Sequence, residues 1–114
     1  MHELAITQEV VRLAAEHARG RVVRRVILEV GQLAAIVPDS VRFCFEALVP
    51  GTALEGASLE ILESPGRARC RPCDVEQDLS SPWGTCASCG GADLEWVGGC
   101  DLRVKALELE VASV

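Results

Sequence analysis

Four cysteines in two Cys-x-x-Cys turns are the residues whose types and spacing most clearly predict chemistry. Cys70 and Cys73 form the first pair, and Cys86 and Cys89 follow after twelve intervening residues. Each turn lets two thiolates reach one ion, and the segment between the turns is long enough to fold back as a small hairpin. Four sulfur ligands favour Zn²⁺, and a closed shell of four thiolates leaves no position for a substrate. The spacing therefore predicts a structural zinc ribbon, with two disulfides or an iron–sulfur site as the alternatives.

The first three residues offer a second and different donor set. The terminal amine of Met1, the backbone nitrogen of His2 and the His2 imidazole can close two fused chelate rings on one ion. Cu²⁺ and Ni²⁺ favour such nitrogen donors in square-planar geometry, and Glu3 can add its carboxylate or backbone nitrogen. The amine and the imidazole must lose protons to bind, so metal affinity should fall on mild acidification. Such an exposed site suits a metal that is handed on, and an ordinary polar N-terminus is the alternative.

Other patterns of catalytic residues are nearly absent from the sequence. No nucleophile elbow, P-loop or dinucleotide-binding glycine motif occurs, and His2 and His17 are the only histidines. Cys44 falls on an apolar helical stripe, which favours a small buried hydrophobe over a redox or metal-binding role. We therefore expect that the protein is not an enzyme.

Charge and composition exclude several classes of partner. The net charge of −6 argues against binding to phosphate backbones, so the cluster of Arg67, Arg69 and Arg71 is interpreted as a solvated rim. No stretch of about 20 apolar residues predicts a membrane span. The N-terminus lacks the basic and apolar regions of a signal peptide. We expect a reducing, cytoplasmic setting, no membrane partner and no nucleic-acid partner.

Apolar periodicity predicts five elements that must position these residues. In chain order they are a helix over 4–18, a strand over 21–31, a helix capped by Asp39 or Ser40 and ended by Pro50-Gly51, and strands over 58–63 and 102–111. The first helix leaves residues 1–3 as a short exposed tail.

The predicted fold class is α/β of the α+β kind, with two helices, a three-stranded sheet and an inserted zinc-ribbon domain. Residues 1–65 and 100–114 are assigned to the α/β domain, and residues 66–99 to the ribbon. Within the ribbon, a small core is expected from apolar side chains of the segment between and after the cysteine turns: Leu79, Trp83, Leu94 and Trp96.

The whole chain resembles the HypA family of hydrogenase nickel-incorporation proteins. The resemblance rests on the start Met1-His2-Glu3-Leu4, on the cysteine quartet, and on intervening and closing segments that come in the family's order: Val26 to Gly31, Val37-Pro38, Phe43 to Glu46, Gly51-Thr52 through Leu59 to Ile61, and Leu102 to Glu110. The N-terminal triplet combined with the quartet makes the resemblance specific.

The resemblance implies a nickel metallochaperone for maturation of [NiFe]-hydrogenase, and in some organisms also of urease. Met1, His2 and Glu3 match the family's nickel positions in an α/β nickel-binding domain, and the cysteine quartet matches its structural zinc ligands. A further acidic nickel neighbour proposed for some members has no clear match, although Asp39 lies nearby. The implied partners are the GTPase HypB and the hydrogenase large subunit, and the chain is expected to be a monomer or homodimer.

Two other functions remain open from the residues alone. One is a zinc-ribbon module that binds nucleic acid or a protein and has no nickel role. The other is a thiol redox protein in which Cys70 and Cys73 cycle between dithiol and disulfide without a metal.

Overall fold

The computed structural model describes residues 2–111, and the chain divides into two compact units. Within the described residues, the first unit comprises 2–28, 36–62 and 103–111, and the second comprises 29–35 and 63–102. Neither helix has the length and apolar character needed to cross a membrane, as far as the described residues extend.

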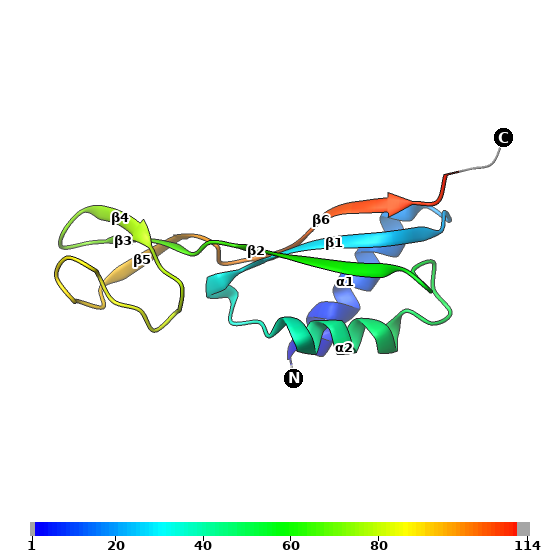
Figure 1. The fold of residues 1–114 in the computed structure, drawn as a ribbon, viewed down its shortest axis with the longest axis horizontal. Helices are drawn as coiled ribbons and strands as arrows, with labels where there is room; N and C mark the ends of the chain where they lie inside the picture. The colour runs from blue at the N-terminus through cyan, green and yellow to red at the C-terminus, as the bar shows by residue number, and fades with distance from the viewer. Residues whose placement is uncertain (1, 112–114) are drawn as a thin grey trace. The chain divides into compact units, whose positions relative to one another are not determined.

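Two helices and two small sheets make up the fold (Figure 1). One sheet has the strand order β2-β1-β6, and the other has the order β4-β3-β5. Because β3, β4 and β5 fall between β2 and β6 in the chain, the predicted insertion into a three-stranded sheet is confirmed. The elements are α1 His2–Ala18, β1 Val23–Gly31, a 3₁₀ turn Gln32–Ala34, α2 Pro38–Leu48, β2 Ser58–Ser64, β3 Arg67–Cys70, β4 Val75–Asp78, β5 Leu94–Gly98 and β6 Leu102–Leu109.

Helix α1 begins at His2, two residues earlier than its apolar periodicity indicates. The expectation of an exposed tail is therefore wrong for His2 and Glu3, while Met1 lies outside the described residues. No glycine or proline interrupts this start, so the helix extends to the first polar residues. The buried side of α1 carries Thr7 and four aliphatic side chains: Val10, Val11, Ala14 and Ala18.

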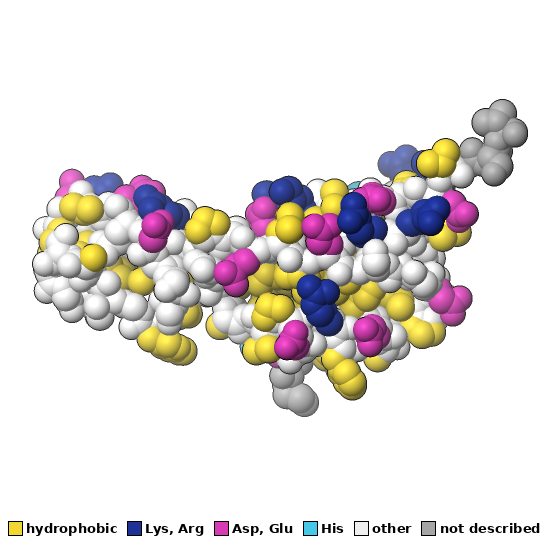
Figure 2. Space-filling view, in the orientation of Figure 1, with side chains coloured by type: hydrophobic (Ala, Val, Ile, Leu, Met, Phe, Trp, Pro, Cys, Tyr) yellow, Lys and Arg dark blue, Asp and Glu magenta, His cyan; other side chains and the backbone are white. Residues whose placement is uncertain are grey.

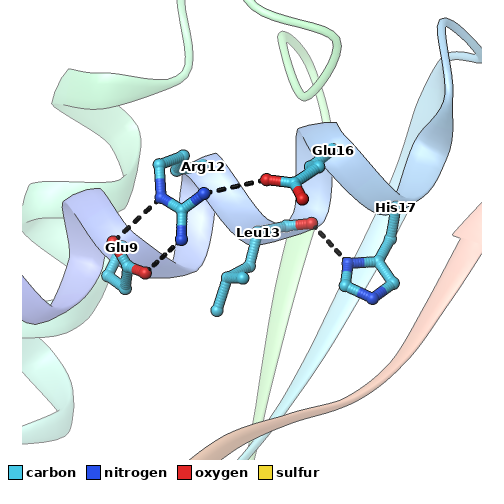
Figure 3. A network of polar contacts seen from close by, with 5 residues as sticks. All are labelled: Glu9, Arg12, Leu13, Glu16 and His17. Atoms are coloured by element: carbon cyan, nitrogen blue, oxygen red, sulfur yellow. Dashed lines mark hydrogen bonds and ion pairs between the residues drawn. The ribbon is translucent and has the colours of Figure 1, made fainter.

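The exposed side of α1 is held by local polar contacts (Figure 3). Arg12 forms ion pairs with Glu9, one turn before it, and with Glu16, one turn after it. The Nδ1 atom of His17 donates to the carbonyl of Leu13 at 2.8 Å. Ion pairs between residues three or four apart, such as the two formed by Arg12, stabilise a helix by about 0.2–0.5 kcal/mol each.

The core of the first unit joins the two helices to β1. Val26 and Leu28 of β1 are fully buried, as are Val41 and Phe45 of α2, which lies against α1. The N-cap of α2 is Val37, without a side-chain capping bond, so the prediction of Asp39 or Ser40 as the cap is wrong. Proline needs no hydrogen-bond acceptor and has a helical φ, so α2 starts directly at Pro38.

The second unit has a small aliphatic core of its own. Leu33, Ala68 and Leu79 are buried there, and Leu94 and Cys100 pack against them. The predicted places of Trp83 and Trp96 in this core are wrong, because these residues are 86% and 46% exposed. Gly84 lies directly against Leu79, so the turn before it closes on the core and leaves the Trp83 indole outside.

Backbone segments approach one another closely at Gly31 and Gly99 in the second unit. The amide of Gly31 donates to the carbonyl of Asp101 at 2.8 Å, and Leu33 donates to Gly99 at 2.8 Å. A Cβ atom on Gly31 would overlap the carbonyl group of Gly99. Gly31 is thus required by close packing, rather than by a positive φ.

We predict that Gly31→Ala destabilises the protein, because the added methyl group has to displace backbone. Overpacking of this kind costs about 1–3 kcal/mol. The matched control is Gly98→Ala, whose Cβ would meet Arg67 at an ordinary 3.5 Å. Chemical denaturation should show a lower unfolding free energy for Gly31→Ala and a change within about 0.5 kcal/mol for Gly98→Ala. Equal effects of the two variants would contradict the close approach.

Candidate metal centres

The four cysteines of the predicted ribbon converge on one point. Their sulfur atoms all lie within 4.8 Å of one another, and the Sγ atoms of Cys70 and Cys89 are 3.8 Å apart. A tetrahedral shell with metal–sulfur bonds of about 2.3 Å places its sulfurs about 3.8 Å apart. All six cysteines of the chain are free, so the alternative of two disulfides finds no support. The quartet therefore fits a single four-thiolate metal ion.

Both Cys-x-x-Cys turns have the same backbone construction. In the first turn, the N–H of Asp74 donates to the carbonyl of Cys70 at 2.7 Å. In the second, the N–H of Gly90 donates to the carbonyl of Cys86 at 2.8 Å. The residue after each turn is left-handed, with φ of 57° at Asp74 and 70° at Gly90, a conformation that Asp and Gly tolerate. The two turns therefore present their thiols in an equivalent way.

Hydrogen bonds shift the pKa values of the Cys86 and Cys73 thiols in opposite directions. The side chain of Gln77 and the backbone N–H groups of Cys89 and Ser88 lower the pKa of Cys86 to about 6, because they stabilise its thiolate. The pKa of Cys73 is raised to about 12, chiefly by hydrogen bonds with the thiols of Cys89 and Cys70. Sulfurs this close cannot all be ionised without a cation between them. A bound metal is what makes a full set of four thiolates stable.

Two residues of the N-terminal donor set, His2 and Glu3, lie in the first turn of α1. The His2 side chain is 63% exposed, and its Nε2 atom lies 3.5 Å from a carboxylate oxygen of Glu3. His2 is the first residue of α1, and the first N–H groups of a helix have no intrahelical acceptor, so metal binding at this nitrogen breaks no helical hydrogen bond. The helical start thus leaves this nitrogen available as a donor.

A recess of about 370 Å³ opens beside Glu3. It is lined by the first turn of α1 and the first two turns of α2: Glu3, Leu4, Asp39, Ser40, Phe43 and Cys44. From the sequence, Asp39 was expected as a helix cap, and as a residue near the acidic nickel neighbour proposed for some members of the HypA family. Its place at the recess depends on the packing of α2 against α1, which the sequence does not reveal. Cys44, expected to be a buried hydrophobe, is half-buried at its wall.

The carboxyl group of Glu3 is favoured in its ionised form at this recess. The pKa of Glu3 is lowered, first by a hydrogen bond from its own backbone N–H and also by the charge of a protonated His2. The positive ends of the dipoles of α1 and α2 favour negative charge at Glu3 and Asp39. The recess therefore offers oxygen donors next to the nitrogen donors of the N-terminus.

His17 cannot join this donor set. It lies at the other end of α1, about 22 Å along the helix axis from His2 at a rise of about 1.5 Å per residue. Its Nδ1 atom is engaged with the carbonyl of Leu13 (Figure 3). The two histidines therefore belong to separate environments.

Arg67, Arg69 and Arg71 do not form a basic surface. They lie along the central strand β3 or just after it, and carboxylates from neighbouring segments pair with them: Arg67 with Glu76 and Asp78, Arg69 with Asp74, and Arg71 with Asp93 and Glu95. Figure 2 shows basic and acidic side chains interspersed on the surface of both units. Five carboxylates surround three guanidinium groups, so this face lacks the positive footprint that nucleic-acid binding needs.

We predict that the quartet binds one metal ion per chain, with the other cysteines as internal controls. Cys73→Ser and Cys86→Ser should abolish metal retention, because a hydroxyl is a far weaker ligand than a thiolate. Cys100→Ser should retain the metal, since its thiol donates to the carbonyl of Gly98 instead. Elemental analysis after gel filtration measures the metal content. Metal loss in Cys100→Ser equal to that in Cys86→Ser would contradict the assignment.

Comparison with known proteins gives a consistent match over the whole chain. Residues 1–109 match the family model described as "Hydrogenase/urease nickel incorporation, metallochaperone, hypA". The "Hydrogenase maturation factor HypA" of Rippkaea orientalis is 52% identical over 110 residues, which are 96% of each chain. The protein of the same name from Trichormus variabilis is 50% identical over 114 residues, the full length of both chains.

Two solved structures share the fold. The solution structure of the Ni metallochaperone HypA from Helicobacter pylori has a TM-score of 0.67 at 20% identity, and covers 94% of this chain and 96% of its own. A second solution structure, described as HypA protein, has a TM-score of 0.69 at 22% identity, and covers 96% of this chain and 97% of its own. Both matches support the arrangement of helices and sheets.

Proposed function

Because the chain belongs to the HypA family of hydrogenase/urease nickel-incorporation metallochaperones, we propose that it binds Ni²⁺ at its N-terminus and delivers it during [NiFe]-hydrogenase maturation. The protein is a maturation factor and not a catalytic enzyme. Nickel is its cargo. The observation that carries the proposal is the position of His2 and Glu3 in the first turn of α1, at an exposed helix start with carboxylates beside it.

The nickel ligands in this proposal are the amine of Met1, the backbone nitrogen and imidazole of His2, and a donor from Glu3. Met1 lies outside the described residues, and its amine enters through the chelate chemistry that the sequence predicts. Ni²⁺ favours such nitrogen and oxygen donors. The Asp39 carboxylate at the recess is a further oxygen donor within the same region.

The same features explain how nickel could be released. An exposed site lets an acceptor protein reach the ion, and each donor can be exchanged one at a time. Affinity in the micromolar range, about −8 kcal/mol, is tight enough to collect nickel and loose enough to pass it on. Urease is a second class of recipient, in keeping with the family description.

The cysteine quartet takes the complementary role of a structural zinc site. A closed shell of Cys70, Cys73, Cys86 and Cys89 offers no vacant position for exchange. Zinc bound there would supply folding free energy to a unit whose strands have only four or five residues. We infer that the partners are a HypB-type GTPase and the hydrogenase large subunit, as expected for a maturation factor of this family.

We predict that His2→Ala weakens nickel binding by at least tenfold, because it removes the imidazole of the chelate. His17→Ala is the matched control, since it removes the same group from the other end of α1. Isothermal titration of Ni²⁺ into zinc-loaded protein measures both affinities. Nickel affinity that is equal in His2→Ala and wild type would refute the N-terminal site.

A blocked N-terminus provides a test that leaves every side chain in place. Acetylation of Met1, or a short Gly-Ser extension before it, removes the free amine as a nickel donor. We expect weaker nickel binding in either form, with zinc content and circular dichroism unchanged. If the acetylated protein bound nickel as tightly as the free form, the amine would not be a ligand.

A further inference from the structure

Gln77 links strand β4 to the second cysteine turn. Its Nε2 atom donates to the sulfur of Cys86 at 3.3 Å. Its Oε1 atom accepts a hydrogen bond from the backbone N–H of Ala87 at 2.8 Å. One side-chain amide therefore contacts both a metal-ligating sulfur and the backbone next to it.

The two cysteine turns depend on such a link to different degrees. The first turn is the connection of a tight hairpin, because Cys70 ends β3 and pairs with Val75 at the start of β4. The second turn lies in the segment 79–93, which has no strand between β4 and β5. Gln77 pairs in register with Ala68, which is fully buried in the core of the second unit. The Gln77 amide thus connects strand β4 to the second cysteine turn, which is the turn that no strand flanks directly.

The chemistry of an amide suits this position. Its NH₂ group stabilises negative charge on the Cys86 sulfur, and its oxygen fixes the Ala87 N–H. A carboxylate of the same shape could accept from Ala87, but it would repel the thiolate. An apolar side chain would provide neither hydrogen bond.

We propose that Gln77 is a positioning residue of the zinc shell, which holds the second cysteine turn against β4 and slows loss of the metal from that side. The inference rests on the proposed zinc occupancy of the quartet, and is independent of the nickel role. Residues that hydrogen-bond to metal ligands commonly change metal affinity about 10–100-fold when they are replaced.

The test compares Gln77→Leu with Gln32→Leu. Gln32 is a matched control in the same unit, since its amide donates to Glu63 at 3.1 Å and accepts from the N–H of Gly66 at 2.9 Å, and neither hydrogen bond involves a cysteine. Competition with a chromophoric zinc chelator should show about 10–100-fold weaker zinc binding for Gln77→Leu. The Gln32→Leu variant should stay within about threefold of wild type.

A spectroscopic measurement separates a direct effect on sulfur from a general loss of folding. In the Co²⁺-substituted protein, the sulfur-to-cobalt charge-transfer band should move to longer wavelength in Gln77→Leu, because an N–H donor no longer stabilises the thiolate. The band should not move in Gln32→Leu. Gln77→Glu should weaken zinc binding further than Gln77→Leu, because it adds charge beside Cys86.

The outcomes distinguish this inference from the proposed zinc role. A wild-type protein that retains no zinc would overturn both the structural zinc site and the role of Gln77. If wild type retained zinc and Gln77→Leu bound it equally tightly, with an unshifted cobalt band, only the Gln77 inference would be overturned. Equal weakening in Gln77→Leu and Gln32→Leu would also overturn it, since the cause would then be the stability of the unit.

Discussion

The convergence of four sulfur atoms within 4.8 Å is the constraint on which the second unit depends. Thiolates at this separation repel one another, so the cluster requires a cation, and the short strands around it add little core of their own. Cys70 is fully buried and Cys86 is 2% exposed, so half of the shell lies inside the unit. A closed site of this kind is suited to retaining a metal, and for this reason the proposed cargo site is placed elsewhere in the chain.

The start of α1 has the opposite properties. His2 is exposed, its backbone nitrogen has no helical acceptor, and the donors around it are nitrogen and oxygen. The neighbouring carboxylate of Asp39 reaches the same recess from the first turn of α2. Two ligand sets of different hardness and accessibility therefore occur in one small protein, which matches the needs of a carrier that has a permanent structural metal and a transient cargo.

The sequence predicted those features that local patterns determine. The spacing of the Cys-x-x-Cys turns and the order of the periodic segments were enough for the quartet and for the fold class. Features set by packing could not be predicted: the exposure of Trp83, the pairing of the arginines with carboxylates, and the place of Asp39 beside Glu3 at one recess. The start of α1 at His2 was missed for a local reason, because His2 and Glu3 are polar and add nothing to the apolar periodicity. The contacts of Gln77 could not be predicted either. A single glutamine in a short strand has no recognisable sequence pattern, and its amide meets Cys86 and Ala87 only because the fold brings β4 beside the second cysteine turn.

The most direct test of this division of labour is X-ray absorption at the nickel and zinc edges of protein loaded with both metals and bearing its native N-terminus. We expect four sulfur ligands around zinc, and nitrogen and oxygen ligands without sulfur around nickel. Sulfur ligands around nickel, with zinc displaced from the quartet, would contradict this expectation.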